Sequence, residues 1–289
     1  MLAVLSVIWG SSFILMKWGL NVYTWSQIGA IRMFVSLLVM FPFVWNSFKK
    51  IEKKNWKFLL VAGLCGNGIP AFLFPLAETH IDSAIAGIIN SLTPLFTLLV
   101  GLIIYRTQLS QNKIIGVFIG LVGAVAIVLG NGKSIDHGNL HFSFYVILAT
   151  ICYAFSVNVL RHNLAAVDSI LTTGFALLFA GIPSGIYLFT TDFISRTQSA
   201  SGAGFSLMSI LLLGVFGTAI STFLFNQLIK RSGALFASSV TYLIPFVAIL
   251  WGLGAGEKLQ IPQLLGFAGI LFGVYLINRS AKGNREIRE

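Results

Sequence analysis

Short polar stretches divide the chain into ten apolar segments, and each segment is long enough to cross a membrane as a helix. A helix needs about 20 mostly apolar residues to cross about 30 Å of hydrocarbon. With 56% of its residues hydrophobic and 10% charged, the chain lacks the polar side chains that would cover a soluble fold. The sequence therefore predicts an all-α polytopic membrane protein and excludes soluble enzymes, disulfide scaffolds, coiled coils and disordered chains. The ten predicted spans are 2–20, 28–46, 58–78, 84–105, 114–130, 142–160, 170–190, 206–229, 234–254 and 262–278.

The positively charged residues gather in alternate loops. If the N-terminus is cytoplasmic, fourteen of the nineteen Lys and Arg residues fall on the cytoplasmic side, four fall outside, and Arg32 lies within a span. Because basic residues beside apolar spans stay in the cytoplasm, we expect both termini there, in a bacterial inner (plasma) membrane. The orientation of the chain in the membrane then accounts for the formal charge of +10, and we expect no nucleic-acid partner. The cytoplasmic set is Lys49, Lys50, Lys53, Lys54, Lys57, Arg106, Lys113, Arg161, Lys230, Arg231, Arg279, Lys282, Arg285 and Arg288.

The sequence also repeats itself. Residues 60–94 align with residues 211–245 at a constant offset of 151 without a gap, and ten of the thirty-five positions are identical. Near the start of the chain, a second match occurs at an offset of 144. The repeat therefore comprises five spans. The matched pairs include Trp9 and Tyr153, Ser12 and Ser156, Gly63 and Gly214, Gly66 and Gly217, Phe74 and Phe225, and Pro94 and Pro245.

An odd number of spans in the repeat has a structural consequence. The second copy must enter the membrane from the side opposite to the first. Inverted repeats are typical of secondary transporters, which bind substrate near the midplane between the two copies. We therefore expect ten transmembrane helices in two inverted five-helix repeats, over residues 1–130 and 142–278, followed by a basic cytoplasmic tail over residues 279–289.

Four short motifs lie in the first, fourth, ninth and tenth predicted spans or directly before them. They are Trp9-Gly10-Ser11-Ser12-Phe13, Ser91-Leu92-Thr93-Pro94, Tyr242-Leu243-Ile244-Pro245, and the stretch from Gly256-Glu257-Lys258-Leu259 to Gly273. With these motifs, and with Arg32 early in the second span, the chain resembles the drug/metabolite transporter (DMT) superfamily, EamA type, over nearly its whole length. The resemblance implies ten helices in two inverted repeats and the export or exchange of small metabolites. Thr107 stands where the first repeat would carry the counterpart of Glu257.

Prolines lie deep in two equivalent spans. Pro94 and Pro245 are each about ten residues from a span end, which is about 15 Å of helix. Each proline frees a backbone carbonyl one turn earlier. We expect a local break there, with the freed carbonyls facing a central cavity. The alternative is a kink whose carbonyls bond to neighbouring helices.

Polar residues recur on the same helical faces. Asn67 and Asn90 in the first repeat correspond to Thr218 and Thr241 in the second, and Tyr242 lies beside Thr241. Buried amides and hydroxyls need hydrogen-bond partners, which water or a substrate in a cavity would supply. We therefore treat these residues as candidates to line the cavity. The alternative is that they bond the helices to one another.

Two ionisable side chains lie within the first-half spans. Arg32 is a candidate partner for a substrate carboxylate or for Glu78, although its stem also allows the guanidinium to reach the headgroups. Glu78 is a candidate for proton coupling, and solvation at the membrane interface is the alternative.

Aromatic and glycine residues add further candidates. Trp9 and Tyr153 could stack on a ligand in the cavity, beside the hydroxyls of Ser12 and Ser156. Glycines in spans 5 and 10 predict close helix packing, either within one protomer or between the protomers of a homodimer. Asp136, His137 and His141 lie in a predicted polar loop, and we expect neither a metal nor a cofactor. The glycines are Gly116, Gly120, Gly123, Gly266, Gly269 and Gly273.

Together these features predict a secondary transporter that exports or exchanges a small metabolite, such as an amino acid or a drug-like solute, by alternating access. Its partners would be the solute, the lipid bilayer, and protons or a counter-solute. One alternative is a non-transporting membrane sensor or assembly subunit. The other is an intramembrane enzyme, and the spans contain no paired aspartates, H-E-x-x-H or G-x-S-x-G motif that would favour catalysis.

Overall fold

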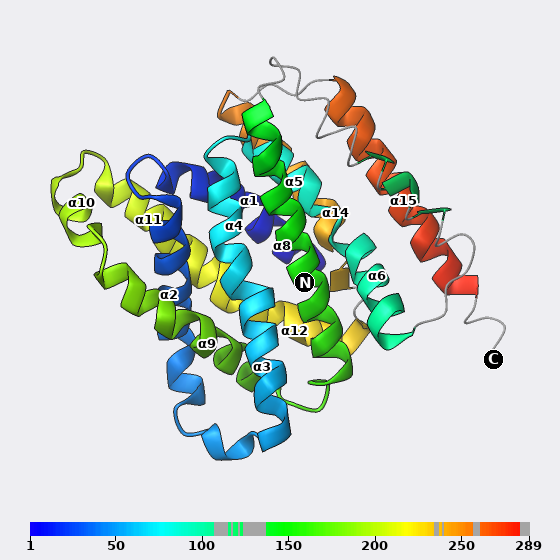
Figure 1. The fold of residues 1–289 in the computed structure, drawn as a ribbon, viewed down its shortest axis with the longest axis horizontal. Helices are drawn as coiled ribbons and strands as arrows, with labels where there is room; N and C mark the ends of the chain where they lie inside the picture. Colours follow the sequence, from blue (N-terminus) through cyan, green and yellow to red (C-terminus); the bar gives the residue numbers. More distant parts are fainter. Residues whose placement is uncertain are drawn as a thin grey trace.

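A computed structural model describes residues 1–106, 115–116, 118–120, 122–123, 137–233, 237–238, 240–256 and 261–283. Over these ranges the chain forms helices and no strands, and the helices lie side by side in one bundle (Figure 1). Seven of the helical stretches are long and apolar enough to cross a membrane. The protein is therefore a multi-span membrane protein. These stretches are Leu2–Gly19, Trp25–Val44, Lys53–Glu78, Ser83–Tyr105, His141–His162, Ser169–Phe189 and Ala203–Ser232.

The first half of the chain supplies four of the predicted spans. Two are single helices and two are interrupted, and the fifth predicted span, 114–130, lies largely outside the described residues. The helices are α1 (Leu2–Gly19), α2 (Trp25–Val44), α3 (Trp56–Gly63) continued through η3 (Leu64–Gly68) and α4 (Ile69–Glu78), and α5 (Ser83–Asn90) followed by α6 (Thr93–Tyr105).

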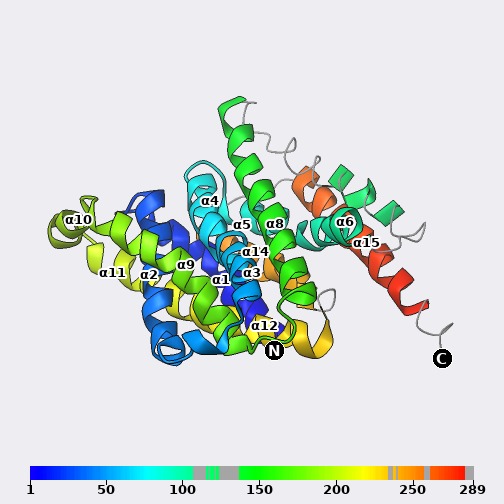
Figure 2. The ribbon, with the colours of Figure 1, turned by 60° about the horizontal axis from the view of Figure 1, so that its bottom comes forward.

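The second half supplies the remaining five. A short helix, α10 (Phe193–Ser199), occupies the predicted loop between the seventh and eighth spans. The helices at these positions are α8 (His137–His162), α9 (Ser169–Phe189), α11 (Ala203–Gly214) continued through η4 (Val215–Ile220) and α12 (Ser221–Ser232), α14 (Val240–Gly254), and α15 (Ile261–Gly283). The last two are not among the seven membrane-spanning stretches given above. In the views of Figure 1 and Figure 2, α10 and α15 lie at opposite edges of the bundle.

The third and eighth spans are interrupted at equivalent positions. Each contains a π-helical segment, and the segments begin at Leu64 and Val215, which are 151 residues apart. A π-helical turn carries one extra residue and is frequent at functional sites. The two copies of the repeat therefore share a local backbone irregularity as well as a sequence.

Helices α2 and α9 are also equivalent, since Trp25 and Ser169 begin them 144 residues apart. They pack against one another along most of their length. A Cβ atom at Gly174 would meet Val44, and a Cβ atom at Gly185 would meet Phe34. Because the contacting position in α2 falls as that in α9 rises, the two helices run antiparallel.

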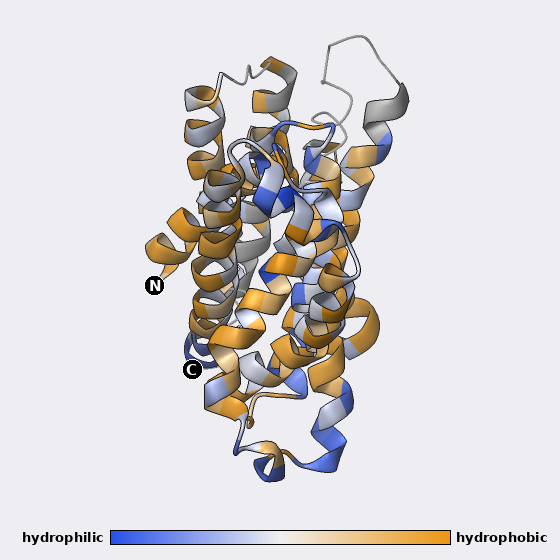
Figure 3. Cartoon of the chain, turned by 90° about the vertical axis from the view of Figure 1, so that its left-hand side faces the viewer, coloured by the Kyte–Doolittle hydropathy of each residue, from blue (hydrophilic) through white to orange (hydrophobic). Residues whose placement is uncertain are grey.

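The helices meet polar loops at two opposite ends of the bundle, and Figure 3 shows apolar helices between these hydrophilic ends. We name one end the lysine end, because it carries loop 45–55 with Lys49, Lys50, Lys53 and Lys54. There Phe48 and Trp56 pack on Phe175, at ring-centroid distances of 5.0 and 5.1 Å. The last residue of α6 and the residue after α8 also meet at the lysine end, where Tyr105 Oη donates a hydrogen bond to Asn163 Oδ1 (2.8 Å).

We name the opposite end the α10 end. Gln27 Nε2, in the first turn of α2, donates to Asp192 Oδ1 (2.7 Å), which precedes α10. Arg196 in α10 donates to Asp192 Oδ2 (2.7 Å) and to the Val22 carbonyl (3.0 Å). These bonds join the α1–α2 loop and the start of α2 to α10 and the residue before it.

The glycines of the fifth and tenth spans face one another within the protomer. A Cβ atom at Gly123 would meet the backbone of Gly266 and Ile270, and a Cβ atom at Gly273 would meet the backbone of Gly116 and Gly120. The predicted close packing is therefore confirmed for the described residues.

The helix break predicted at the two prolines is present in one span and absent from the other. α5 ends at Asn90, and α6 begins at Thr93 with Pro94 in its first turn, where a missing N–H costs nothing. α14 instead runs without interruption through Pro245. A proline within a helix removes one hydrogen bond and can kink the helix without ending it.

Candidate functional site

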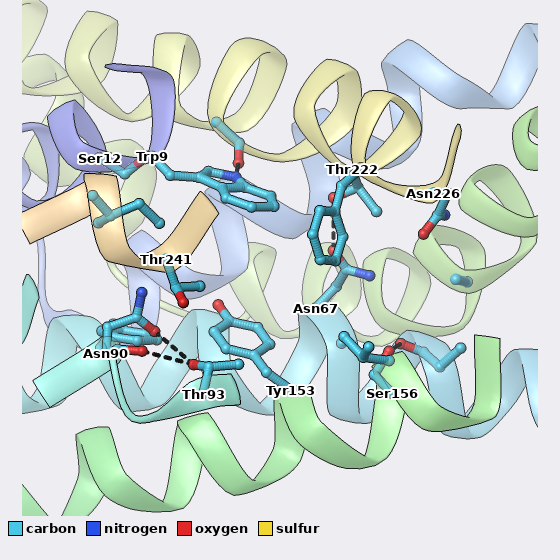
Figure 4. Close-up of a pocket in the computed structure, with 18 of the residues that line it drawn as sticks. Trp9, Ser12, Asn67, Asn90, Thr93, Tyr153, Ser156, Thr222, Asn226 and Thr241 are labelled. Carbon is cyan, nitrogen blue, oxygen red and sulfur yellow. Dashed lines mark hydrogen bonds between the residues drawn. The ribbon is translucent and has the colours of Figure 1, made fainter. Parts of the chain in front are cut away.

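A cavity of about 110 Å³ lies in the middle of the bundle, between the lysine end and the α10 end. This volume accommodates several water molecules or part of a small solute. Figure 4 shows side chains from α1, α8, α12 and α14 around it. The lining residues are Trp9, Ser12, Phe13, Met16, Arg32, Ala62, Gly66, Asn67, Phe74, Asn90, Thr93, Tyr153, Ser156, Val157, Leu160, Ala176, Gly217, Thr222, Phe225, Asn226, Thr241 and Ile244.

Most of these lining residues occur in equivalent pairs. Eighteen of the twenty-two form nine pairs at the offsets of the internal repeat, 144 for the first two helices of each copy and 151 for the others. Both copies of the repeat therefore contribute the same positions to one cavity. The pairs are Trp9/Tyr153, Ser12/Ser156, Phe13/Val157, Met16/Leu160, Arg32/Ala176, Gly66/Gly217, Phe74/Phe225, Asn90/Thr241 and Thr93/Ile244.

The wall contributed by α1 is fixed to the second repeat by the indole of Trp9. Its Nε1 donates to the Gly217 carbonyl (3.0 Å) and to Ser221 Oγ (2.9 Å), both at or beside η4. The ring also packs edge-on against Phe225, with 5.1 Å between centroids. Because its donor is already used, Trp9 offers the cavity an aromatic surface.

Threonine hydroxyls contact both asparagines that the first repeat places at the cavity. Thr93 Oγ1 donates to the Asn90 carbonyl (2.8 Å), and its distance to Asn90 Oδ1 is 3.4 Å. Thr222 Oγ1 donates to Asn67 Oδ1 (3.2 Å). Figure 4 shows both contacts at the cavity surface.

The only cationic side chain among the lining residues of the described structure is Arg32, which is 8% exposed. Its Nε donates to Thr218 Oγ1 (2.6 Å), and Tyr153 and Glu78 lie close enough to act on the guanidinium electrostatically. A guanidinium has five N–H donors, and Thr218 accepts one of them.

The repeats also correspond to a known family. A model described as the EamA-like transporter family matches residues 1–129 and 142–279. The chain belongs to the EamA-like transporter family. It is therefore a membrane transporter, as its resemblance to DMT-type proteins implies.

Three relatives of this transporter illustrate the similarity. An uncharacterized transporter of Archaeoglobus fulgidus is 25% identical, with 96% of this chain and 97% of the relative covered. The uncharacterized inner membrane transporter YedA of Escherichia coli is 26% identical, with 94% and 88% covered. A probable terminal-alkyne amino-acid exporter of Streptantibioticus cattleyicolor is 23% identical, with 96% and 92% covered.

The fold is also found among solved structures. A protein of known crystal structure matches the transporter with a TM-score of 0.68 and 17% sequence identity, over 97% of this chain and 96% of the other. At 17% identity, this match shows a similarity of fold and nothing about function.

Eight of the twelve candidate binding residues predicted from the sequence line the cavity of this transporter. They are Trp9, Ser12, Arg32, Asn67, Asn90, Tyr153, Ser156 and Thr241. The other four lie outside the lining. Thr218 is behind Arg32, and Tyr242 packs against the apolar core. Pro94 and Pro245 are buried within α6 and α14. Glu78 is also buried, near the end of α4, and does not line the cavity.

Sequence reasoning missed several lining residues. The pair Phe74 and Phe225 is identical in the repeat alignment, so that alignment could have identified it. Asn226 had no such signal, because its counterpart in the first repeat is Pro75.

The cavity is not symmetric. Four lining residues, Ala62, Asn67, Thr222 and Asn226, have counterparts that are buried and do not line it. Thr222 and Asn226 belong to α12, which runs toward the lysine end, whereas their counterparts Ala71 and Pro75 belong to α4, which runs toward the α10 end. The cavity of this transporter therefore extends toward the lysine end.

Proposed function

We propose that this transporter exports or exchanges a small metabolite across the bacterial inner membrane by alternating access. In this proposal, ten helices form two inverted five-helix repeats around the cavity, and both termini are cytoplasmic. The main support for the proposal is that lining residues from the two copies of the repeat occur in equivalent pairs. Nine equivalent pairs face one cavity, so a gate at one end of the bundle has an equivalent at the other.

The antiparallel packing of α2 and α9 supports the inversion. These helices are equivalent in the repeat, and each close approach, such as that of Gly174 to Val44, pairs opposite ends of the two. Two copies related in this way enter a membrane from opposite sides.

The charge distribution supports the orientation. Basic side chains remain on the cytoplasmic side of a bacterial membrane, which makes the lysine end cytoplasmic in our proposal. The cavity extends toward that end, so the described conformation corresponds to a cytoplasm-facing state. In the outward-facing state, the counterparts Ala71 and Pro75 would line the cavity instead of Thr222 and Asn226.

The named relatives support the location and the direction. YedA is described as an inner membrane transporter, and the Streptantibioticus protein is described as a probable amino-acid exporter. By analogy, we propose an amino acid or a drug-like solute as the cargo.

The test is solute flux in sealed proteoliposomes. Purified protein would be screened by thermal shift against a metabolite panel, because ligands that bind the native state raise its melting temperature. The best ligands would then be tested as radiolabelled solutes in counterflow. We expect exchange by the wild type and none by Thr241→Phe, which fills the cavity, whereas Thr190→Phe at an exposed site should retain exchange. A folded wild type that moves no solute contradicts the proposal and favours a non-transporting sensor.

A further inference from the structure

The loop between α2 and α3 carries a dense group of lysines. Figure 1 shows this loop at the lysine end, beyond the last turn of α2. Glu52 is the one acidic residue among residues 45–57, so five lysines and one glutamate give this segment a net charge of +4. We name the five exposed lysines the lysine patch. They are Lys49, Lys50, Lys53, Lys54 and Lys57.

The lysine patch lies on a folded segment. Ser47, Ile51 and Asn55 are buried at intervals of four residues, and Ile51 packs in an apolar cluster with side chains of α2, α3 and α9. Two 3-10 turns, η1 (Phe48–Lys50) and η2 (Lys53–Asn55), lie between these buried positions. The buried residues attach the loop to the bundle, and the lysines between them are therefore held on its outer side.

Most of the lysine patch has no counter-charge in the protein. Lys54 pairs with Glu52 (2.7 Å), but the other four lysines form no ion pair with any residue that the structure describes. In the equivalent loop of the second repeat, residues 190–202, the one cation is Arg196, and it pairs with Asp192 (2.7 Å). Like charges close together repel one another. An external anion at the lysine patch would therefore stabilise the loop.

Large apolar side chains are exposed directly beside the lysine patch. Phe43 and Trp45, at the end of α2, are 57% and 61% exposed, and Phe48 in the loop is 42% exposed. Because α2 is long and apolar enough to cross a membrane, its end lies at the level of the lipid headgroups. Aromatic rings and lysine stems both favour this level. A phospholipid offers a phosphate to the lysines and acyl chains to the rings, whereas a soluble anion offers only the charge.

We propose that the lysine patch, together with Phe43, Trp45 and Phe48, forms a binding site for an anionic phospholipid. The ammonium groups bind the headgroup phosphate, and the aromatic rings contact the acyl chains just below it. This inference goes beyond the proposed function. It requires only that the chain spans a membrane, and its tests involve no transported solute.

Thermal shift of the full-length protein in detergent tests the ligand. The probes are dioleoyl phosphatidylglycerol, dioleoyl phosphatidylcholine, glycerophosphoglycerol and poly-L-glutamate. The second keeps the acyl chains without a net charge, the third keeps the anionic headgroup without acyl chains, and the fourth represents an acidic protein. We expect phosphatidylglycerol to raise the melting temperature most, because a ligand that binds the native state stabilises it. An equal rise with any other probe would overturn the proposal.

A triple variant tests the lysines. Lys49→Gln, Lys50→Gln and Lys53→Gln together remove three exposed charges and leave the pair between Lys54 and Glu52 intact. One lysine near an anionic lipid surface contributes about fivefold to binding, so the dissociation constant for phosphatidylglycerol should rise about a hundredfold. The melting temperature without lipid checks that the variant folds. An unchanged dissociation constant in the folded variant would overturn the proposal.

A second triple variant is the matched control. Arg106→Gln, Arg161→Gln and Arg231→Gln remove the same charge from exposed residues at the ends of α6, α8 and α12. These residues also lie at the lysine end, but on other helices, so the affinity for phosphatidylglycerol should be nearly unchanged. Equal losses in the two triple variants would mean that the lipid follows the net charge of the whole end, and that result would overturn the proposed site.

Fluorescence quenching tests the position of the lipid independently of charge variants. Bromine atoms on an acyl chain quench tryptophans that the chain contacts. We expect brominated phosphatidylglycerol to quench the protein more than brominated phosphatidylcholine, and Trp45→Phe to lose most of that difference. Trp251→Phe is the control, because Trp251 is also exposed (42%) but packs against Trp18 near the α10 end. A difference that persists in Trp45→Phe would overturn the proposed contact.

Discussion

Arg32 in α2 donates a hydrogen bond from its Nε to Thr218 Oγ1 in the π-helical segment η4, over 2.6 Å. One turn along α2, Ser36 Oγ donates to the Arg32 carbonyl (2.6 Å) and to the Gly214 carbonyl (2.9 Å). These bonds join the second span of one repeat to the third span of the other. Thr218 therefore acts on the cavity through Arg32, by fixing the position of the guanidinium.

The first prediction tests this coupling. Thr218→Val removes the acceptor of Arg32 Nε, and we expect about a tenfold loss of exchange rate, because hydrogen bonds to charged groups are stronger than neutral ones. Arg32→Lys cannot reproduce the planar fork and should lose at least as much. The double variant should be little worse than Arg32→Lys, since both changes break one interaction. Initial rates of counterflow measure these effects. Additive losses would show that the two residues act independently.

The second prediction concerns access from the two sides of the membrane. In a background with Cys65 and Cys152 replaced by alanine, Thr222→Cys should react with an impermeant thiol reagent added at the cytoplasmic side. Ala71→Cys, its counterpart, is buried in the described state and should react only from the outside, during transport. Reaction of both cysteines from the same side would contradict the inverted arrangement.

Substrate protection provides a further comparison in the same background. Asn90→Cys lies at the cavity surface and should be protected by a bound solute, whereas Tyr242→Cys lies outside the lining and should show no such protection.

The third prediction concerns stability. A Cβ atom at Gly63 would overlap the backbone of Ala176 in α9, whereas a Cβ atom at Gly204 has no atom within 4 Å. Gly63→Ala should therefore destabilise the protein by about 1–3 kcal/mol through overpacking. Gly204→Ala should stabilise it by a few tenths of a kcal/mol, because alanine favours the helix. Melting temperatures in detergent would measure both. Equal melting temperatures for the two variants would contradict the close approach of α3 to α9.

Repetition is the reason that much of the site could be predicted from sequence. Polar and aromatic residues at equivalent positions, such as Trp9 with Tyr153 and Asn90 with Thr241, line the cavity in both copies. Because both copies surround one cavity, a polar or aromatic residue that occurs at the same position in each copy is a candidate for its lining.

Two of the candidate residues, Thr218 and Tyr242, lie outside the lining of the described cavity. The sequence predicts Thr218 at the cavity because it is the counterpart of Asn67 in the repeat. Thr218 instead lies behind Arg32 and accepts a hydrogen bond from its Nε, although Asn67 in the equivalent π-helical segment does line the cavity. Tyr242 directly follows Thr241 and points about 100° away from it around the helix, where its ring packs against the apolar core instead of lining the cavity. Neither the hydrogen bond from Arg32 to Thr218 nor the packing of Tyr242 follows from the correspondence of polar residues between the two copies.

The fourth prediction concerns pH at the α10 end. Hydrogen bonds from Arg196 and Gln27 hold the pKa of Asp192 below its usual range. A lowered pKa means that the folded state favours the carboxylate. The stabilisation is therefore complete above the ordinary aspartate pKa of about 3.9 and is lost as the pH falls through the lower, folded-state value. Asp192→Asn should melt below the wild type at pH 7, and the difference should shrink below about pH 4. Glu52→Gln, at an exposed pair with Lys54, is the control. A difference that does not vary with pH would contradict this account.

The fifth prediction concerns the coupling of transport to protons. Glu78 is 6% exposed in the last turn of α4 and acts electrostatically on Arg32, which lines the cavity. A change in its protonation would alter the field at the guanidinium and so link proton movement to binding. Glu78→Gln keeps the shape but cannot titrate, so it should abolish uptake driven by a pH gradient while leaving solute exchange intact. The control is Asp82→Asn, which removes a carboxylate in the adjacent loop that lies 3.8 Å from Lys17. Uptake would be measured in proteoliposomes with and without a pH gradient. If the pH dependence is unchanged in Glu78→Gln, Glu78 is not the coupling group, and the carrier is an exchanger or couples through another residue.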